Sequence, residues 1–560
     1  MRMDGPKGQG GRRWPEAFTP KLVVALREGY GTERLYRDAL AGLTVAIVAL
    51  PLSMAIAIAS GASPESGLYA AIVGGAIVSA LGGSRYQIGG PAGAFIVLVA
   101  AIIARHGFDG FLLATMIAGL ILIALGALRL GTYIRYIPHP VVVGFTAGIA
   151  AIIAASQLKD LLGVRLAGPE PGPVLEKLAA LGEAIHTTSP AAVVVALATI
   201  AVIAGLKRLR PTAPGMLIAV ALAAGATALL GLPLETIGTR FGGIPSGLPA
   251  PALPVVTWER VVDVLPDAFA IALLGGIESL LSAVVADGMS GRRHRSDMEL
   301  VAQGAANIGS ALFGGLCVTG TIARTATNVR SGAVSPVSGI LHAGFLLGFM
   351  LVAAPLAAYI PLAALAGLLL FVAWNMAEKH EFLGILRRSR AEAVVLLVTF
   401  GLVVFRDLTE GILVGVVLGA FVFLHRMATL VGVEEAQAPE EDETASGRDV
   451  MVTRFSGPLF FAATARVAGT LERIGGFPPF VVLDLSAVPL VDVSAVATLE
   501  GFVARARASG ACVVVSGARP EVRRALAHAG LRPPKVRYAA SLAAARAYAE
   551  RRLEGDRPGG

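Results

Sequence analysis

Charged residues are scarce in this chain, which has 560 residues and is 55% hydrophobic but only 15% charged. Soluble globular proteins carry about 25% charged residues, so an entirely water-soluble chain is excluded. The charges are also unevenly spread, because Ala39–Pro64, Gly110–Leu128 and Thr187–Leu206 have none, and Ser331–Ala377 has only the ionisable His342. Uncharged apolar runs of about 18 or more residues are typical of membrane-spanning helices, which predicts a polytopic helical membrane protein.

Cysteine is nearly absent as well. Cys317 and Cys512 lie far apart, so we expect neither a disulfide framework nor a metal site. The sequence has no nucleophile elbow or phosphate-binding loop, so we expect no enzyme activity and no cofactor. Residues 1–38 are polar and basic and lack the apolar core and cleavage site of a signal peptide, so we expect a cytoplasmic N-terminal segment there.

The net charge of +8 does not indicate nucleic-acid binding, since Lys and Arg gather at the ends of the apolar runs. Basic residues favour the cytoplasmic side of membrane proteins. Loops on the N-terminal side are the more basic, with Arg292, Arg293, Arg295, Arg387 and Arg388 among their residues. We therefore predict a multi-pass protein of the cell's inner (plasma) membrane, with its N-terminus and its C-terminal tail in the cytoplasm.

Hydropathy predicts a transmembrane domain over residues 39–430 with about fourteen spans. Their centres lie near Leu50, Val73, Val97, Gly119, Ile149, Leu197, Ala221, Leu274, Ala306, Ala326, Gly348, Leu368, Leu397 and Val417. The third and tenth spans are short and interrupted by Gly or Pro. Residues 431–448 are acidic and rich in Glu, Ala, Pro and Ser, which predicts a flexible linker.

A small soluble domain is predicted over residues 449–553, followed by a disordered tail at 554–560. β-rich runs alternate with helical stretches, which favours a mixed sheet covered by helices. The expected strands are Val450–Phe455, Phe480–Leu485 and Ala511–Ser516, and the expected helices lie around Ala463–Ile474, Ser494–Ala508, Pro520–His528 and Ser541–Leu553.

Two regions of the transmembrane domain resemble each other. Ser79–Gly83 precedes Gly89–Pro91, and the similar Ser310–Gly315 precedes Thr319–Thr321. Interrupted spans at matching places in two halves are typical of inverted-repeat transporters, although chance similarity in Ala/Gly-rich sequence is an alternative. Pro91 suits a first helical turn, and Thr319 and Thr321 are candidate N-caps. Two helix N-termini meeting within the membrane would attract an anion, and Arg324 adds a positive charge.

Glu278 lies inside the apolar stretch Leu273–Ser282. An ionisable group within a span is costly and indicates a function: it could carry a proton, bind a cation or form a structural pair with Arg324. An anion entering beside a carboxylate repels it, so a proton arriving with the anion would link the two binding events. We predict proton coupling through Glu278, with Ser282 as a further candidate coupling-ion residue and sodium as the alternative ion.

Several segments in this order resemble the SulP family of sulfate permease-like anion transporters, related to the animal anion exchangers and prestin. The matching segments are Ala41–Val45, Leu50-Pro51, Gly67–Tyr69, Gly89–Ala94, Glu278–Ser282, Ala286-Asp287 and Arg324–Asn328. The resemblance spans nearly the whole chain and implies fourteen spans in a seven-plus-seven inverted repeat. It also implies a core domain that moves as an elevator against a gate domain, a homodimer, and a small anion as substrate.

The substrate-binding residues that this resemblance implies are Leu52, Ile56, Gly90, Pro91, Ala92, Gly93, Thr321, Ile322, Ala323 and Arg324. Many animal relatives have a glutamine and two phenylalanines where Leu52, Ile56 and Ala92 stand here. The pocket floor is therefore expected to be less aromatic, and sulfate, bicarbonate, chloride and small dicarboxylates all remain possible substrates.

The tail resembles the STAS domain, related to anti-sigma-factor antagonists, at Leu483–Ser486 and Val491–Ala495. Ser494 falls where the antagonists carry a phosphorylatable serine, but we favour a helix-capping role for Asp492 or Ser494. The partner of this domain is not indicated.

Three functions other than proton-coupled anion symport are alternatives. A nucleobase–proton symporter shares the fold, but Arg324 and the STAS-like tail argue against it. A sodium-coupled bicarbonate transporter is a second alternative. A non-transporting membrane anchor for a signalling domain is a third, and the intact helix starts and Glu278 argue against it.

Overall fold

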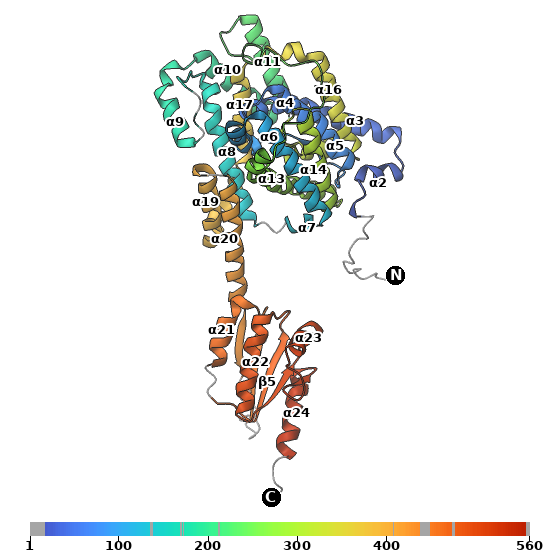
Figure 1. The fold of residues 1–560 in the computed structure, drawn as a ribbon, viewed down its shortest axis with the longest axis vertical. Coiled ribbons are helices and arrows are strands. Elements are labelled where there is room, and N and C mark those ends of the chain that lie inside the picture. The colour runs from blue at the N-terminus through green and yellow to red at the C-terminus, as the bar shows by residue number, and fades with distance from the viewer. Residues whose placement is uncertain are drawn as a thin grey trace. The chain divides into compact units, whose positions relative to one another are not determined.

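The computed structural model describes residues 17–134, 138–168, 171, 173–210, 213–406, 408–436, 449–472 and 476–555 (Figure 1). It comprises two compact units, residues 1–416 and 417–560. In the described part, nine helices are long and apolar enough to cross a membrane, which confirms the prediction of a polytopic helical protein. All of the predicted span centres lie within helices.

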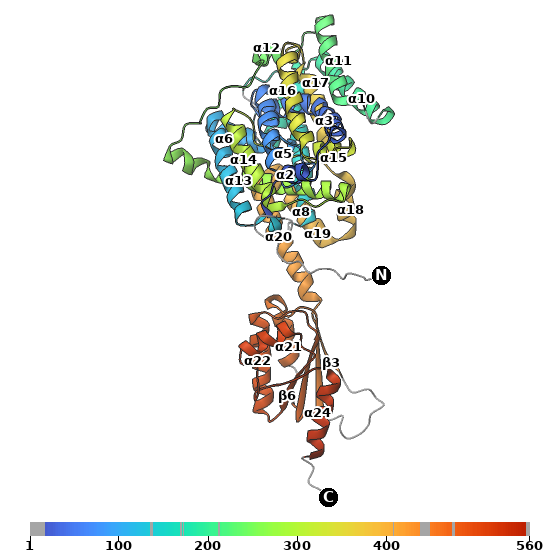
Figure 2. The ribbon, with the colours of Figure 1, turned by 90° about the vertical axis from the view of Figure 1, so that its right-hand side faces the viewer.

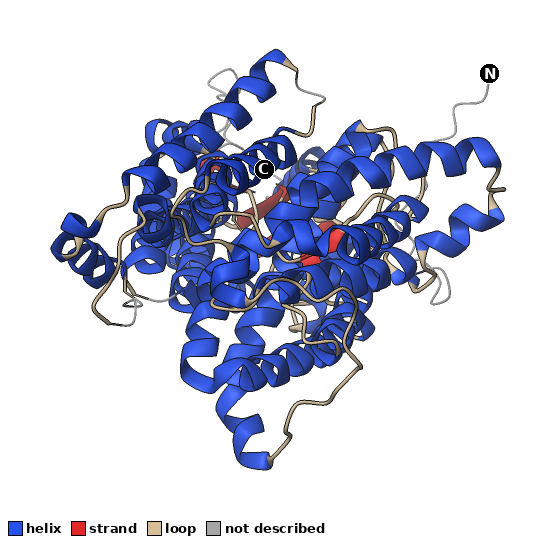
Figure 3. Ribbon diagram, turned by 90° about the horizontal axis from the view of Figure 1, so that it is seen from above, coloured by secondary structure: helices blue, strands red, loops and turns tan. Residues whose placement is uncertain are grey.

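The membrane unit is built almost entirely from helices (blue in Figure 3). Its first half contains α2 (Lys21–Arg27), α3 (Thr32–Ala59), α4 (Pro64–Tyr69), η1 (Ala70–Gly74), α5 (Gly75–Leu81), β1 (Gly89–Gly90), η2 (Gly93–Phe95), α6 (Ile96–Ala127), α7 (Gly131–Ile134), α8 (His139–Leu162), α9 (Val174–Glu183), η3 (Ile185–Thr187), α10 (Pro190–Leu209), α11 (Gly215–Leu230) and α12 (Ile237–Phe241). The second half contains α13 (Trp258–Ser290), α14 (Ser296–Leu312), β2 (Thr319–Gly320), α15 (Ile322–Arg330), α16 (Val337–Ala357), α17 (Leu362–Met376), α18 (Lys379–Arg388) and α19 (Arg390–Phe405), and α20 (Leu408–Thr429) begins in this unit and continues into the C-terminal unit.

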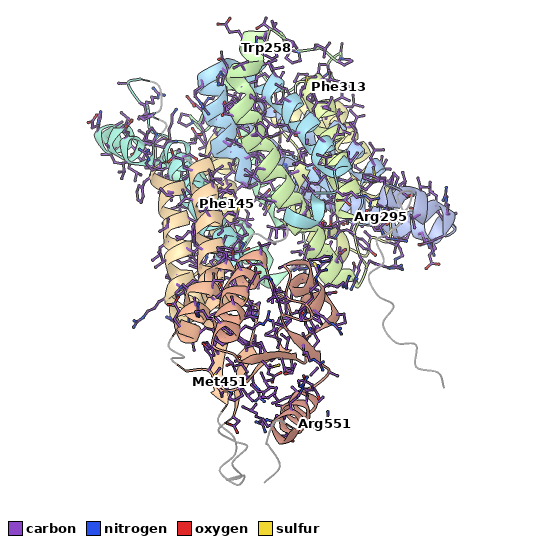
Figure 4. The ribbon with its side chains drawn as sticks, turned by 60° about the horizontal axis from the view of Figure 1, so that its bottom comes forward. Phe145, Trp258, Arg295, Phe313, Met451 and Arg551 are labelled. Atoms are coloured by element: carbon purple, nitrogen blue, oxygen red, sulfur yellow. The ribbon has the colours of Figure 1, made fainter. Side chains whose placement is uncertain are left out.

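The two interrupted spans are short, as predicted. The ribbon of α6 breaks at Gly107, whose φ of 70° is left-handed, so its first piece ends there, and α15 has only 9 residues. By contrast, α13 runs for 33 residues. Trp258 at its start and Arg295 just beyond its end lie at opposite ends of this helix (Figure 4).

Close backbone contact holds α6 against α14. A Cβ atom on Gly119 would lie 2.6 Å from the carbonyl oxygen of Gly304, and one on Gly304 would lie 2.4 Å from that of Gly119. Small residues let helices approach closely in membranes, where dispersion contacts drive association. The glycine pair therefore packs a helix from each half of the chain against the other.

The predicted N-terminal segment ends inside a helix, because α3 begins at Thr32 and runs to Ala59, and its boundary at residue 38 stays a prediction. Asp38 is fully buried. It accepts hydrogen bonds from the Tyr30 hydroxyl (2.8 Å), the Val334 amide (2.7 Å) and the Ser335 hydroxyl (2.5 Å). These bonds satisfy the carboxylate and attach the polar start of α3 to the loop before α16.

The C-terminal unit contains a mixed five-stranded sheet with the strand order β3-β4-β5-β6-β7, in which only the β3–β4 pair is antiparallel. The strands are β3 (Gly432–Ala436), β4 (Val450–Ser456), β5 (Phe480–Ala487), β6 (Cys512–Ser516) and β7 (Arg537–Ala539), and the helices are α21 (Phe461–Glu472), α22 (Val493–Ala508), α23 (Pro520–His528) and α24 (Leu542–Gly555). Successive side chains of a strand point to opposite faces. Val481 and Val513 face the core that contains α21, α22 and α23, whereas Val482 and Val514 face α24. Helices α21 and α22 lie on one side of the sheet and α24 on the other (Figure 2).

The predicted linker at 431–448 is wrong in its first part. Gly432–Ala436 form β3, which pairs with β4 and covers an edge that would otherwise be open to other chains. The acidic composition of this segment did not indicate a strand. The rest of the predicted linker, residues 437–448, lies outside the described residues. The short strand β7 was not predicted either, and of the predicted tail only Glu554 and Gly555 are described, as the end of α24.

Two acidic side chains of the C-terminal unit have well-defined hydrogen-bond partners. Burial raises the pKa of Asp484, but hydrogen bonds from Ser486, Arg454 and Ser516 outweigh it and hold the pKa below its usual value. Asp492 caps α22 by accepting from the Ala495 amide at 2.9 Å, which confirms the predicted capping role.

Candidate functional site

A short antiparallel crossing joins two segments that are far apart in the sequence. Strands β1 and β2 pair with Gly90 opposite Thr319, and the Thr321 amide donates to the carbonyl of Ile88 at 3.2 Å. Strand β1 leads into η2 and α6, and β2 leads into α15. The two halves of the predicted repeat are therefore in direct contact at their helix starts.

The helix starts differ from the predictions in detail. Ala92 is the N-cap residue of η2, so Pro91 lies before the helix and not in its first turn, because pairing with β2 keeps the chain extended. Thr321 is the N-cap residue of α15, as predicted, but its side chain makes no cap hydrogen bond. The Thr321 hydroxyl is buried without a hydrogen-bond partner, and the Thr319 hydroxyl donates to the carbonyl of Gly275 at 3.0 Å.

Arg324 points into the crossing from the first turn of α15 and is only 2% exposed. Its Nη2 donates to the Ser53 hydroxyl at 3.1 Å and to the Pro91 carbonyl at 3.3 Å. Its Nε and Nη1 are buried without a partner, and no carboxylate among the described residues forms an ion pair with it. A buried cation without a counter-ion is costly, so the crossing offers free donors and positive charge to an anion.

Gly90 makes room for this guanidinium. A Cβ atom at this position would lie 2.2 Å from Nη1 of Arg324, which no larger residue could accommodate without displacing the arginine. The next glycine differs, because a Cβ atom on Gly93 would meet nothing closer than Ile153 Cδ1 at 3.8 Å. One helix start therefore provides space and the other provides charge.

A second set of contacts ties the crossing to α13. The Thr325 hydroxyl accepts from the Ile88 amide at 3.2 Å and from the Ser282 hydroxyl at 3.1 Å. The Gln87 amide nitrogen donates to the hydroxyl and the carbonyl of Ser279, at 2.7 and 3.0 Å. Because α13 also carries Glu278, these bonds fix the predicted coupling residue relative to the predicted anion site.

Glu278 is partly buried on α13. In the part of the chain that the structure describes, no ion pair joins it to Arg324. The alternative of a fixed structural Glu–Arg pair is therefore not realised among the described residues. Ser282, in contrast, is fully buried and already engaged with Thr325.

The remaining predicted residues divide into two groups. Leu52, Ile56 and Ala92 are buried in the main hydrophobic core of the membrane unit, so the floor beside the crossing is apolar. Ile322 and Ala323 are exposed on the first turn of α15, so their backbone but not their side chains belongs to the helix start.

Sequence reasoning missed three supporting residues, Ser53, Gln87 and Thr325. Ser53 lies in a charge-free run, and its hydroxyl also donates to the Ala49 carbonyl at 2.7 Å, as expected of any serine within a span. Gln87 and Thr325 flank the two strands, and polar residues so close to an interrupted span were the available indication.

Comparison with known proteins identifies the family of the chain. The chain matches the model of the Sulfate permease family over residues 35–399 and that of the STAS domain over residues 443–545. It is 37% identical over 507 residues (90% of this chain, 95% of the relative) to YvdB of Bacillus subtilis (strain 168), provisionally named a sulfate transporter. It is 33% identical over 517 residues (88% and 90%) to the bicarbonate transporter BicA of Synechocystis sp..

Two solved structures have the same architecture. The murine Slc26a9 anion transporter in the inward-facing state superposes with a TM-score of 0.85 at 18% identity, over 98% of this chain and 97% of that chain, which shows the fold. The transmembrane domain of a cyanobacterial BicA superposes with a TM-score of 0.61 at 33% identity, over 70% of this chain and 98% of that chain. The matched families are those of a permease and a STAS module, which confirms that the chain is not an enzyme. It belongs to the sulfate permease (SulP) family and carries a C-terminal STAS domain.

Proposed function

We propose that this chain carries small anions across the inner membrane and binds them at the β1–β2 crossing. The observation that carries this proposal is Arg324, a buried guanidinium with two unpartnered donor nitrogens and no counter-ion among the described residues. The helix starts of η2 and α15 add free backbone N–H groups and the positive ends of two helix dipoles. An anion bound there would supply the missing partner.

The substrate proposed is a small oxyanion of the sulfate, bicarbonate or dicarboxylate class. Relatives named for sulfate and for bicarbonate are both similar to this chain over most of its length. A guanidinium with free nitrogens suits an anion that presents more than one oxygen. The apolar floor at Leu52, Ile56 and Ala92 gives such an anion shape restriction without further charge.

The proposed architecture is fourteen spans in a seven-plus-seven inverted repeat. The support is the contact between two similarly built helix starts, each at an interrupted span. We further propose a homodimer, an elevator movement of the core domain against the gate domain, and a cytoplasmic location for the N-terminus and the STAS domain. The excess of basic residues in the N-terminal-side loops supports this orientation.

Glu278 is proposed to couple anion entry to a proton. An isolated carboxylate in low-dielectric surroundings is costly as an anion, and a second negative charge nearby adds repulsion. A proton that binds together with the substrate removes both costs, so the two affinities are linked. Sodium would need several oxygen ligands, and the Ser282 hydroxyl, which donates its hydrogen to Thr325, leaves its oxygen as only one of them.

Uptake into proteoliposomes tests this coupling. We expect an inward proton gradient to drive concentrative uptake, Glu278→Gln to abolish it, and the same variant to retain exchange of anion at equal concentrations. Glu259→Gln, an exposed acid near the start of the same helix, is the matched control and should behave like the unaltered protein. Uptake driven by a sodium gradient at matched pH, and indifferent to protons, would refute proton coupling in favour of sodium.

The location of the substrate has its own test. Ala92→Trp should block uptake, because tryptophan is larger than the phenylalanine that many relatives carry at this place, whereas Ala104→Trp on the exposed face of α6 should not. Normal uptake by a correctly inserted Ala92→Trp variant would count against this site.

A further inference from the structure

A cavity whose lining includes no residue of β1, β2, η2 or α15 lies among α8, α10, α17, α18 and α19. Its volume is about 920 Å³, which is within the range of pockets that bind small molecules. Apart from Lys379, every lining residue is apolar: Ala147, Ala150, Ala151, Ala154, Ile200, Ala204, Leu370, Phe371, Ala373, Trp374, Ala377, Phe382, Leu383 and Phe400. Helices α8, α10 and α17 lie side by side there (Figure 1).

We propose that this cavity binds an anionic phospholipid, with an acyl chain against the alanine-rich wall and the phosphate at Lys207 and Lys379. The proposal is independent of the anion that the crossing binds.

Polarity changes along the cavity in the way a phospholipid requires. Lys207 lies in the last turn of α10, Trp374 in the last turn of α17, and Lys379 is the first residue of α18. Tryptophan and lysine concentrate where helices leave the hydrocarbon region. The opposite part of the wall comes from Ala147–Ala154, in the middle of α8, so the apolar part extends from the helix ends toward the centre of the unit.

Both lysines are held at this end by neutral groups. Lys379 Nζ donates to the Trp374 carbonyl at 2.9 Å and lies 3.3 Å from the centre of the Trp374 ring. Lys207 Nζ donates to the Asn375 side-chain oxygen at 3.0 Å and lies 5.3 Å from the centre of the Phe371 ring. Neither lysine forms an ion pair within the described ranges, so both positive charges remain for a phosphate.

The open side of the cavity favours a lipid, and the nearby acids leave both lysines unpaired. Glu378 and Glu381 are exposed and form no ion pair with either lysine in the described part. Trp374 is 66% exposed, so the cavity opens laterally at its basic end, where a lipid could enter from the bilayer. Basic pockets between membrane helices recognise anionic headgroups.

Native mass spectrometry of the full-length protein, titrated with phosphatidylglycerol or with phosphatidylcholine of the same chains, tests this proposal. We expect phosphatidylglycerol to bind more tightly, and Lys207→Gln and Lys379→Gln each to weaken it about 5-fold without affecting phosphatidylcholine. Arg387→Gln, which removes an exposed charge from the same helix, is the matched control and should change nothing.

Variants that fill the cavity provide a second test of this proposal. Ala151→Phe on α8 and Ala204→Phe on α10 enter it from different walls, so a folding defect in one does not leave the question open. Each should abolish binding of both lipids. Equal lipid binding by all variants would overturn the proposal, as would a change of oligomeric state in the filled variants, measured by light scattering, since the cavity would then be an interface with a second copy.

Discussion

The segments Gly89–Gly93 and Thr319–Arg324 each contain a two-residue strand that is followed by the start of a helix. Only the second segment carries a charged residue. The first consists of glycine, proline and alanine, and its glycine at position 90 is what allows the second to bury Arg324. The two helix starts therefore have a similar backbone arrangement but different side chains. A single guanidinium can serve two helix starts because both meet in one place.

The comparison with the C-terminal unit shows why this asymmetry matters. There the buried Asp484 accepts hydrogen bonds from Ser486, Ser516 and Arg454, so its charge is satisfied by the fold itself. At the crossing, Arg324 keeps two nitrogens without a partner. Leaving a buried charge unsatisfied lowers stability, which supports the proposed role of Arg324 in binding an anion.

Removing the charge should give the largest effect. Arg324→Gln is expected to lower anion affinity about 100-fold or more, since each hydrogen bond to a charged group contributes about 1.5–3 kcal/mol. Because a buried unpaired cation is lost, the melting temperature should not fall. Calorimetric titration of the purified protein with sulfate and bicarbonate measures the anion affinity, and thermal unfolding measures the melting temperature.

Arg330→Gln, at the exposed end of the same helix, is the control for this experiment and should bind normally. Undiminished affinity in Arg324→Gln would show that the two helix starts do not differ in the way we propose.

Removing the space should come next. Gly90→Ala places a methyl group 2.2 Å from the original position of Arg324 Nη1, so the guanidinium must move away from the anion. We expect uptake to fall about 10-fold, the cost of weakening one charged hydrogen bond. Gly344→Ala, where a Cβ atom meets nothing within 4 Å, should leave uptake unchanged. Equal rates for the two variants would contradict the proposed role of Gly90.

A backbone-supporting contact should matter less. Thr319→Val removes the hydrogen bond to the Gly275 carbonyl, which is expected to cost about 0.5–1 kcal/mol of unfolding free energy. Steric-trapping measurements of unfolding should detect this loss, while uptake should fall less than about threefold. A loss of uptake as large as that of Gly90→Ala would mean that the strand pairing, and not the guanidinium, limits binding.

Removing the whole C-terminal domain should have the smallest effect on affinity. A chain ending at Leu430 keeps the crossing intact and should bind sulfate or bicarbonate within about twofold of the full protein. A chain ending at Arg448 retains β3 without its partner β4, and an open strand edge favours aggregation. Calorimetry and size-exclusion chromatography of both chains check this, and failure of the shorter chain to bind would mean that the membrane unit is not complete by itself.

Much of the architecture was accessible from local patterns. Apolar runs located the helices, because burial in lipid requires the same chemistry along a whole span. A β-rich, nearly continuous apolar run at Phe480–Leu485 located a central strand. Local sequence patterns gave wrong predictions where the structure depends on pairing with a distant segment. The acidic segment β3 is a strand because it pairs with β4. Pro91 lies outside the helix because β1 pairs with β2.

The sequence by itself determined that this is a polytopic membrane protein with two similar interrupted spans, an arginine in one of them and a glutamate in a neighbouring span. Only the tertiary structure decided how these residues relate. Glu278 and Arg324 form no ion pair in the described part of the chain, and Ser53 of α3 contacts the guanidinium. The missing side chain at Gly90 leaves the space that Arg324 occupies. Contacts between segments so distant in sequence depend on how whole helices pack, and composition and spacing within one segment carry no information about them.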